Sequence, residues 1–499
     1  MSADKQVVII GAGPTGLGAA VRLLELKHPN FHLYDGGTAP GGLSRSVKDE
    51  KGFLWDMGGH VIFSHYAYFD DVMNLAIADW NTLQRESWVR CSDTWVPYPF
   101  QSNIHRLPPK MRDACLKGIE EAEAARATAA QEKPRNFAEY VSRQFGEGIA
   151  DIFMRPYNFK VWAVPLHVMS TEWVGERVAN VNVERIKENV QLNRDDLGWG
   201  PNATFRFPKA GGTGAIYEAV WRMIPETHKS LGPPHRVTKV NPITKTLTLA
   251  SGEAVQYDAL VSTMPLDDLL RAIASGLEEE DAEAASRSLL RAPRLREVAD
   301  QMIYSSTHIV GIGVKGRPPM EMQTACWLYF PGDGIPFYRA TIFSRYADTN
   351  APAGHWSVML EVSQNDAYKS VDADTIVEDC ITGLQRATLL RPEDEVVSCW
   401  HHIETKGYPV PFVGRNEMLE EVLPVLRDTH QIYSRGRFGA WKYEVANQDH
   451  SWMQGVEAVG HILHGTFEDT VHAPEKVNSK RSEARCRLAA VPTLGGQSS

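Results

Sequence analysis

QVVIIGAGPTGLGAAVRLLEL, residues 6–26, is the stretch that decides the fold of this chain. QVVII is a short apolar run typical of a buried strand, GAGPTG is a tight turn, and LGAAVRLLEL has the composition of a helix. A second strand, FHLYD, follows at residues 31–35. Strand, turn, helix and strand in this order predict the first unit of a Rossmann-type α/β domain.

Three glycines in the turn have the spacing of a dinucleotide fingerprint. Gly11 permits the tight turn, Gly13 lets the backbone approach a pyrophosphate, and Gly16 allows close helix packing. Asp35 ends the second strand about twenty residues on, where an acid takes a ribose hydroxyl pair. The turn residues expected at the nucleotide are Gly11, Gly13, Pro14, Thr15 and Gly16. The alternative is a glycine-rich turn that binds nothing.

Further signals favour FAD over NAD as the bound nucleotide. APGGLSRS, residues 39–46, follows the acid with a second glycine pair, which suits the extended diphosphate of FAD. Val237 in VTKV and Thr263 in VSTMP are typical of the later segments of such domains, against adenine and on the return strand. The residues expected in the second loop are Gly41, Gly42, Leu43 and Ser44. NAD(P)H remains a candidate visiting reductant.

Composition restricts the class of protein. The chain has 499 residues, 43% apolar and 23% charged, with a formal net charge of -10, so we expect a globular protein of two or three domains and no nucleic-acid partner. Six scattered cysteines without a CxxC pair indicate a reducing compartment. The N-terminal apolar run VVII is too short for a signal peptide or membrane span, so a cytoplasmic protein without membrane partners is expected.

The changes in composition and hydrophobic pattern along the chain predict a discontinuous domain with two insertions. An FAD-binding domain is expected from residues 1–109, 205–302 and 410–475. A helical domain rich in Ala, Glu, Arg and Leu is expected at 110–204, and a mostly antiparallel sheet at 303–409. Residues 476–499 are expected to form a flexible tail. The active site is expected in the cleft where these parts meet.

Aromatic rings and arginines recur in the inserted segments. Flat rings beside an amide, as in RPYNFKVWAVP and TWVPYPFQSNI, could sandwich a pyrimidine and bond its edge. Arginines near tyrosines suit a pyrophosphate, because a guanidinium pairs bidentately with its oxygens. This combination favours a nucleotide sugar over the apolar substrates that most such flavoproteins oxidise.

The same segments carry a resemblance to a known family. GAGPTGLGAA, WDMGGHVIFSHY, VPYPFQ, RPYNFKVWA, WVGERV, FPKAGGTGAIY, YRATIFS and GRFGAWKYEVANQDHS resemble the eukaryotic type of UDP-galactopyranose mutase. The resemblance spans about residues 5–465, and its motifs are long and specific. It implies an isomerase that interconverts UDP-galactopyranose and UDP-galactofuranose with no net redox change. It also implies that N5 of reduced FAD is the nucleophile at the anomeric carbon, UDP is the leaving group and NADPH is the reductant.

The resemblance assigns roles by position. Arg177 and Arg339 are similar to the pair that grips the diphosphate, and His60, in the Gly58-Gly59-His60 loop, to the residue beside the flavin. The implied substrate contacts are Phe63, Tyr98, Phe100, Gln101, Tyr157, Asn158, Trp162, Arg177, Asn202, Trp327, Tyr329, Arg339, Tyr408, Tyr443 and Asn447. The implied contacts at the far rim of the flavin are Arg437, Asn447, Gln448 and Ser451. Those for NADPH are Arg85 and Ser87.

Several of these residues can also be weighed against a simpler explanation. His60 could be a packed loop histidine and Arg177 a surface arginine, whereas Arg339 among strand apolar residues is costly to bury without an anion. Trp162 and Trp327 could be core residues. His401 and His402 are adjacent, so their rings point apart and no metal is assigned. The acidic segment SGLEEEDAEAASRS, residues 275–288, is expected to be a solvated helix face.

Two alternative functions remain open at the level of sequence. A flavin-dependent, amine-oxidase-like oxidoreductase would pass electrons to dioxygen and consume its substrate as reductant. A non-catalytic nucleotide-sugar binding protein would bind UDP with the flavin absent or inert. The sequence leaves the oligomeric state open, including a homo-oligomer.

Overall fold

The predicted strand–turn–helix–strand unit is present in the computed structural model, which describes residues 4–128, 132–197, 200, 203–278 and 291–488. Strand β1 is Val7–Ile10, helix α1 is Pro14–Glu25 and strand β2 is Phe31–Asp35. A side chain on Gly16 would overlap the Gly11 carbonyl oxygen, so glycine is needed for α1 to pack closely on the turn before it.

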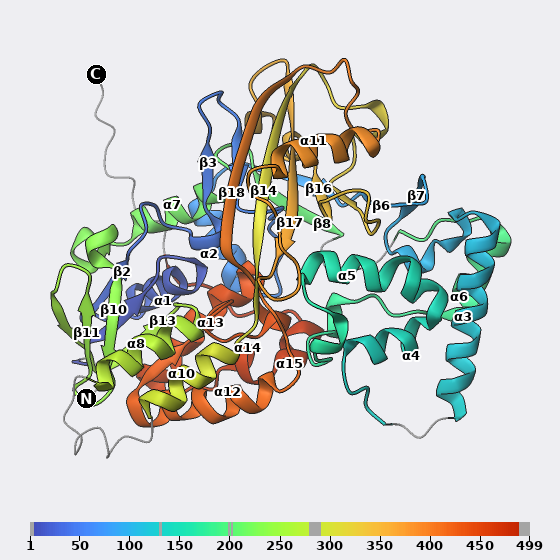
Figure 1. The fold of residues 1–499 in the computed structure, drawn as a ribbon. Helices are drawn as coiled ribbons and strands as arrows, with labels where there is room; N and C mark the ends of the chain where they lie inside the picture. The colour runs from blue at the N-terminus through green and yellow to red at the C-terminus, as the bar shows by residue number, and fades with distance from the viewer. Residues whose placement is uncertain (1–3, 129–131, 198–199, 201–202, 279–290, 489–499) are drawn as a thin grey trace.

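A five-stranded parallel sheet is built from segments far apart in the sequence. Its order is β19-β13-β1-β2-β9, with β9 at Lys229–Leu231, β13 at Ala259–Ser262 and β19 at Ile432–Ser434. Helix α13, Gln448–His464, packs against α1. The N-terminal, middle and C-terminal segments therefore share one α/β unit, at the lower left of Figure 1.

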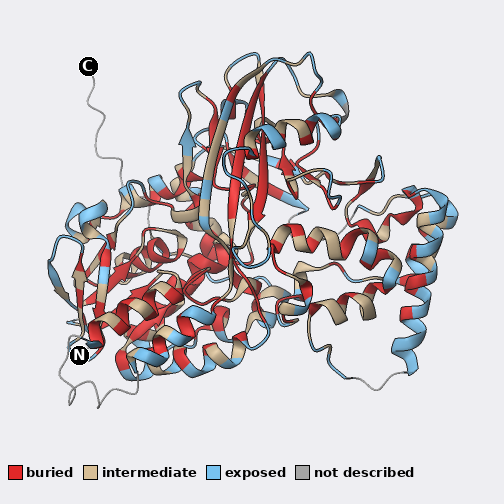
Figure 2. Ribbon diagram, in the orientation of Figure 1, coloured by how far each residue is buried: buried red, intermediate tan, exposed pale blue. Residues whose placement is uncertain are grey.

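A meander and several helices flank this sheet. Strands β10 (Val237–Asn241), β11 (Thr246–Leu249) and β12 (Ala254–Gln256) form an antiparallel three-stranded sheet. Helices α8 (Leu266–Glu278), α10 (Ala292–Gln301) and α12 (Arg415–Pro424) lie nearby, with buried residues turned inward and exposed residues outward in Figure 2. This is the burial pattern of amphipathic helices on a core.

The described part of the predicted helical region contains four α-helices. They are α3 (Pro109–Thr128), α4 (Phe137–Ile149), α5 (Arg155–Trp162) and α6 (Val183–Leu192), with a π-helical turn, Ala150–Met154, leading into α5. In Figure 1 they stand apart from the nucleotide-binding sheet, at the right. Helix α5 carries the predicted Tyr157, Asn158 and Trp162.

A seven-stranded sheet lies between these two parts. Its order is β18-β14-β17-β16-β15-β6-β7, and its long strands are β14 (Tyr304–Lys315), β17 (His355–Gln364) and β18 (Val396–Pro409). The short strands are β15 (Trp327–Tyr329), β16 (Arg339–Thr341), β6 (Ser87–Cys91) and β7 (Thr94–Pro97). β6 pairs with β15 in parallel and the other pairs are antiparallel. Helix α11, Ile376–Arg386, packs on this sheet.

Two strands of this sheet come from a segment assigned by sequence to the first FAD-binding part. β6 and β7 are short, and periodicity does not show which sheet a short strand will join. The domain boundaries themselves stay a prediction.

Smaller elements complete the described fold. They are the hairpin β3 (Ser46–Lys48) and β4 (Leu54–Asp56), the pair β5 (Trp80–Gln84) and β8 (Thr204–Pro208), and helices α2 (Ala67–Ala76), α7 (Gly214–Met223), α14 (Asp469–His472) and α15 (Pro474–Ser479). Among the helices of the described ranges, none combines the length and apolarity needed to cross a bilayer.

The expected flexible tail is wrong for residues 476–488. Residues 474–479 form α15, and Ser482 pairs with Tyr66 in a parallel bridge. The Arg481 guanidinium donates to the Ser64 carbonyl oxygen at 2.8 Å and pairs with Asp70. Backbone bonds and ion pairs hold the segment, and Val477, Cys486 and Leu488 pack against the apolar core without forming a periodic apolar face. We call residues 480–488 the C-terminal strap.

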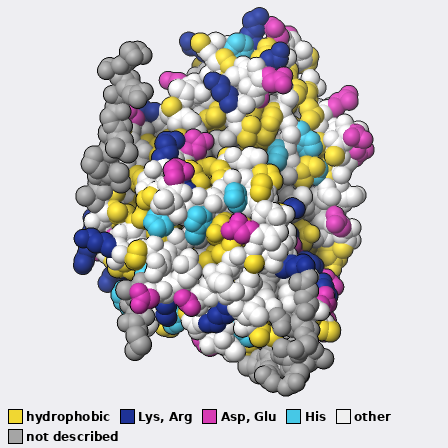
Figure 3. Space-filling view, turned by 90° about the vertical axis from the view of Figure 1, so that its left-hand side faces the viewer, with side chains coloured by type: hydrophobic (Ala, Val, Ile, Leu, Met, Phe, Trp, Pro, Cys, Tyr) yellow, Lys and Arg dark blue, Asp and Glu magenta, His cyan; other side chains and the backbone are white. Residues whose placement is uncertain are grey.

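Some predictions fall outside the described residues, namely Asn202 and most of the acidic segment 275–288. On the face shown in Figure 3, basic and acidic side chains are interspersed with apolar ones.

Candidate active site

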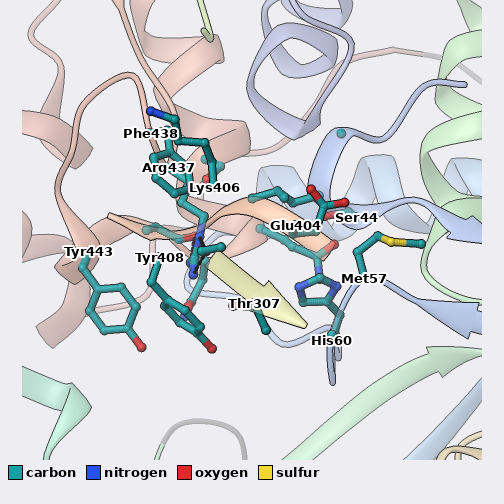
Figure 4. Close-up of a pocket in the computed structure, with 18 of the residues that line it drawn as sticks. Ser44, Met57, His60, Thr307, Glu404, Lys406, Tyr408, Arg437, Phe438 and Tyr443 are labelled. Carbon is teal, nitrogen blue, oxygen red and sulfur yellow. Dashed lines mark hydrogen bonds between the residues drawn. The ribbon is translucent and has the colours of Figure 1, made fainter. Parts of the chain in front are cut away.

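One cavity of about 810 Å³ is lined by residues of the nucleotide-binding sheet, the helical region and the seven-stranded sheet. Figure 4 shows part of its wall. The predicted residues on the wall are Gly11, Gly13, Pro14, Thr15, Asp35, Gly42, Leu43, Ser44, Gly58, Gly59, His60, Phe63, Arg85, Tyr98, Gln101, Tyr157, Asn158, Trp162, Arg177, Val237, Thr263, Trp327, Arg339, Tyr408, Arg437, Tyr443, Asn447, Gln448 and Ser451. The fold thus brings most of the predicted site together.

Other predicted residues lie behind the wall. Phe100 is fully buried and stacks on Phe153 at 4.6 Å between ring centroids. The Tyr329 ring lies 5.3 Å from that of Tyr98, and Ser87 is buried on β6. Gly16 and Gly41 support the two glycine turns. Their roles as direct contacts stay predictions.

One end of the cavity is shaped for a dinucleotide. The Asp35 carboxylate accepts the backbone N–H groups of Ala12 and Gly37, each at 2.6 Å, and so fixes the turn against the end of β2. The N-termini of α1 and α13 both reach the wall, and neither has a side-chain cap. Uncapped N–H groups and the helix dipoles favour an anionic group there.

The WDMGGH segment forms a tight loop beside the seven-stranded sheet. Gly58 has φ +123°, and a side chain on Gly59 would lie 2.7 Å from Thr341 Oγ1 and 3.0 Å from Trp327 Nε1. Glycine is therefore required at both positions, for backbone conformation and for space. Burial lowers the pKa of His60 to about 4, helped by the positive charges of Arg437 and Arg339. His60 is accordingly a neutral imidazole at pH 7.

Arg339 is paired with a buried acid that sequence reasoning missed. Its Nε and Nη2 donate to the Glu361 carboxylate at 2.7 and 2.9 Å, and Gly59 N–H donates to the same carboxylate at 2.6 Å. Burial alone would raise the pKa of Glu361, but the Arg339 guanidinium lowers it below its ordinary value. Glu361 lies in the apolar strand segment VMLEVS, so the argument applied to Arg339, that a charge there needs a partner, could have found it.

Arg177 reaches the cavity with a different set of partners. Its Nη1 donates to Asn447 Oδ1 at 2.7 Å and its Nη2 to the Glu444 carbonyl oxygen at 3.1 Å. The guanidinium lies 5.5 Å from the centroid of the Tyr443 ring. The neighbouring Glu176 carboxylate is 3.9 Å away, so Arg177 is much less neutralised than Arg339.

Tyrosines and Trp162 surround the end of the cavity near the helical region. The Trp162 ring packs edge-on against those of Tyr443 and Tyr408 at 4.7 and 5.6 Å, and Tyr157 packs against Tyr329 at 5.6 Å. Burial raises the pKa of Tyr157, Tyr329 and Tyr408, so their hydroxyls stay protonated and can donate to an anion. In Figure 4, Tyr408 and Tyr443 lie side by side, with Arg437 adjacent and His60 on the other side of Thr307.

Polar atoms in the wall remain without hydrogen-bond partners among the described residues. They are His60 Nδ1, Gln101 Oε1, Glu176 Oε1, Arg177 Nε, His235 Nδ1, Thr307 Oγ1, Trp327 Nε1, Asn447 Nδ2 and Asp449 Oδ1. Buried polar groups are normally hydrogen-bonded, so this concentration indicates a wall shaped for polar ligands. Thr307 and His235 were not predicted, and no sequence motif points to them.

Comparisons with known proteins agree with this geometry. The flavin-containing amine oxidoreductase family model matches residues 14–462. A crystal structure of reduced UDP-galactopyranose mutase is 56% identical to the chain, covers 97% of it and 99% of its own length, and superposes with a TM-score of 0.92.

More distant matches share the fold or part of the sequence. Cyclohexylamine oxidase from Brevibacterium oxydans is 12% identical, with 93% of this chain and 99% of that one covered and a TM-score of 0.64. A zeta-carotene desaturase of Zea mays is 32% identical over 131 residues, which is 25% of this chain and 23% of the desaturase. With 56% identity along nearly its whole length, the chain belongs to the UDP-galactopyranose mutases, within the flavin-containing amine oxidoreductase family.

Proposed function

We propose that this protein is an isomerase that interconverts UDP-galactopyranose and UDP-galactofuranose. The observation that carries the proposal is the 56% identity to the reduced mutase, spread over 97% of the chain. The cavity supports it, because it joins a dinucleotide-shaped end to an end with arginines and tyrosines.

FAD fits the first end of the cavity. The glycine turns at Gly11–Gly13 and Gly42, the uncapped N-termini of α1 and α13, and Asp35 at the end of β2 would hold the dinucleotide. Reduced FAD, when bound, would supply a nucleophilic flavin nitrogen for the anomeric carbon of the sugar. The neutral His60 and the Gly58-Gly59 backbone would border the flavin without adding a charge.

The arginines and tyrosines would bind the diphosphate and stabilise its charge as the bond to the sugar breaks. Arg177 can offer Nε, which has no partner among the described residues, and the Tyr408 and Tyr443 rings lie on the same wall. Arg339 would contribute through Nη1, since Nε and Nη2 are bound to Glu361. Donors fixed before the charge develops lower the barrier, because they need no reorganisation.

Gln101 and the nearby rings would bind the uracil base. Gln101 Nε2 donates to the Ala179 carbonyl oxygen at 2.7 Å, which leaves Oε1 as a buried acceptor without a partner among the described residues. An acceptor fixed in this way matches the N3–H of uracil. Tyr98 and Tyr157 flank this part of the wall and can contact the base through their faces.

NADPH is the proposed reductant. The Arg85 guanidinium lies on the wall, 5.6 Å from the Tyr98 ring centroid, where it could pair with a phosphate of the visiting nucleotide. Anaerobic mixing with NADPH should bleach the yellow flavin, and a flavin that stays oxidised would exclude this reductant.

The isomerase is tested by mixing dithionite-reduced protein with UDP-galactofuranose and separating the nucleotide sugars by anion-exchange chromatography. We expect UDP-galactopyranose to form over many turnovers, without reductant being consumed in proportion. An amine-oxidase-like enzyme would instead take up dioxygen with an amine substrate and leave UDP-galactofuranose unchanged.

A further inference from the structure

Behind the wall that carries Arg177 lies a buried histidine that the proposed chemistry does not use. His65 follows the His60 loop by five residues and does not itself line the cavity. Its ring Nδ1 is 2.8 Å from Asp449 Oδ2, and its ring Nε2 is 3.2 Å from Glu176 Oε2. Its backbone N–H donates to the same Asp449 oxygen at 2.9 Å.

Both ring nitrogens face carboxylate oxygens, so only the doubly protonated ring can donate to both. Burial opposes a charge on the ring, but the bonds to Asp449 and Glu176 raise the pKa of His65 to about 9. Despite burial, the pKa of Asp449 is lowered by the neighbouring His450 ring and by the bonds from His65, and the bond to His65 lowers the pKa of Glu176. His65 is therefore an imidazolium between two carboxylates at pH 7.

The other groups around His65 do not replace it in this role. The His450 ring stacks on His65 with centroids 4.7 Å apart, and burial lowers the pKa of His450 to about 4, so it is neutral. The Tyr66 hydroxyl bonds to Thr470 Oγ1 at 2.8 Å. From the C-terminal strap, the Arg481 guanidinium pairs with Asp70 rather than with this cluster. Arg177 is the other positive charge beside Glu176.

The bridge spans two elements that Arg177 also joins. Glu176 lies in the short 3-10 turn Gly175–Arg177, and Asp449 lies in the first turn of α13. Arg177 crosses the same gap by donating to Asn447, the residue that precedes α13. Two links thus run in parallel between the turn and the helix. One is the Arg177–Asn447 bond on the cavity wall, and the other is the His65 bridge, whose ring lies behind the wall while its carboxylate partners Glu176 and Asp449 line the cavity.

We propose that His65 is a positioning residue, which bridges Glu176 to Asp449 and thereby holds the Arg177 guanidinium where it meets the diphosphate of a nucleoside diphosphate. The inference rests on the proposed function of the cavity. A bridge that only stabilised the fold would leave the affinity for UDP unchanged in folded protein. The readout is therefore UDP binding, measured by isothermal titration calorimetry on the FAD-loaded protein.

His65→Asn keeps one hydrogen bond to Asp449 but cannot span both carboxylates. We expect UDP affinity to fall by about tenfold at pH 7, which is the size of effect expected when one charged contact is no longer held in position. Glu176→Gln breaks the other end of the bridge and should also weaken UDP binding, although Glu176 lines the cavity itself; His65→Asn is therefore the primary test. His430→Asn is the matched control, since His430 is also buried and bonded, to the Pro242 carbonyl oxygen, but lies away from the cavity.

A double variant separates positioning from stability. If His65 acts through Arg177, His65→Asn should weaken UDP binding in the wild type but add little in an Arg177→Ala background. Equal losses in both backgrounds would overturn the proposal. So would unchanged affinity in both His65→Asn and Glu176→Gln.

The pH dependence gives an independent check. The pKa of His65 is raised above its ordinary value, so the bridge is complete below about pH 6.5 and is lost as pH rises through about 9. UDP affinity of the wild type should fall over this upper range, and His65→Asn should lack that fall. Identical profiles would contradict the inference.

Two further outcomes are decisive. The ring and carboxylate atoms of His65, Asp449 and His450 also lie close enough together to bind a metal ion. If EDTA weakens UDP binding and Zn²⁺ restores it, a metal ion and not an imidazolium holds the cluster. The inference would then be wrong. A wild-type protein that binds no UDP overturns the proposed function as well, whereas active wild type with normal UDP affinity in His65→Asn overturns only the role of His65.

Discussion

Arg177 and Arg339 reach the same cavity with different electrostatic surroundings. Arg339 is paired with Glu361, which is 1% exposed and also accepts the Gly59 N–H. Arg177 is held mainly by two neutral acceptors, the side-chain amide oxygen of Asn447 and the backbone carbonyl oxygen of Glu444. An anion on this wall should therefore interact more strongly with Arg177, while Arg339 is also part of the fold.

Arginine truncation should separate binding from stability. Arg177→Ala should reduce turnover by roughly 10²–10³-fold through lost stabilisation of the leaving diphosphate. Arg339→Ala should reduce turnover as well and also destabilise the protein by about 3–5 kcal/mol, because it leaves a buried carboxylate unpaired. Steady-state kinetics and urea unfolding measure the two effects. Adding Glu361→Gln to Arg339→Ala should recover part of the stability, and near-normal rates in both single variants would refute the diphosphate assignment.

His60 should act through position rather than by exchanging protons. His60→Ala should slow turnover by about tenfold or more while the flavin stays bound, because the glycine turns and helix N-termini lie elsewhere on the wall. Since burial lowers the pKa of His60 to about 4, the variant and the wild type should show the same pH dependence of rate between about pH 5 and 8. Unchanged kinetics would reduce His60 to a packing role.

At the scale of elements, the C-terminal strap secures the segment that carries His65. Ser482 N–H donates to the His65 carbonyl oxygen at 2.7 Å, and Ala67 N–H donates to the Ser482 carbonyl oxygen at 2.8 Å. These two bonds attach the C-terminal strap to the segment that runs from the His60 loop to the start of α2. The strap thus supports the site from outside the cavity.

Removal of the strap should loosen this segment. A chain ending at Ser479 should lose about 2 kcal/mol of stability, from a few backbone bonds and the two ion pairs Arg481–Asp70 and Arg485–Asp71. Limited proteolysis should then cut near residues 61–70 earlier than in the full chain. Lys476→Ala is a control on α15, because it removes a surface pair with Asp469 and leaves the strap in place. Equal melting temperatures for full and shortened chains would contradict this role.

At the scale of the whole molecule, the fold does not determine the function. Cyclohexylamine oxidase has the same architecture at 12% identity, so the architecture alone does not select a reaction. The helical region and the seven-stranded sheet add side chains such as Trp162, Arg177 and Arg339 to the wall, and we propose that these side chains select the reaction.

Global stability should depend on the protonation of a buried acid on α13. Burial raises the pKa of Glu457 to about 7, and its carboxyl accepts the N–H and hydroxyl of Thr470 at 2.8 Å. Because this pKa lies above its ordinary value, protonated Glu457 stabilises the folded protein. This stabilisation is complete below about pH 4.5 and is lost as pH rises through 7. Glu457→Gln should remove this loss, amounting to about 2–3 kcal/mol between pH 4.5 and 8. Thermal unfolding across this range checks it, and parallel curves would exclude the assignment.

Much of the fold could be predicted because its signals are local. GAGPTG between two apolar runs specifies a turn, a helix N-terminus and parallel strands within thirty or so residues. The strands β14 and β17 of the large sheet were also visible, since they are long and apolar. The C-terminal strap and the place of β6 and β7 were not, because each depends on partners remote in sequence.

By itself, the sequence determined that the chain has a Rossmann-type nucleotide unit, a helical region and a sheet, and which motifs would converge on the site. Those properties follow from residue spacing and from the resemblance of short motifs, and both depend on residues that are close together in the sequence. Only the tertiary structure decided that Glu361 would pair with Arg339 and bond to Gly59, 302 residues away, and that His65 would bridge Glu176 and Asp449, at separations of 111 and 384 residues. Buried charges select whichever opposite charge the packing brings within reach, and no local pattern encodes that choice.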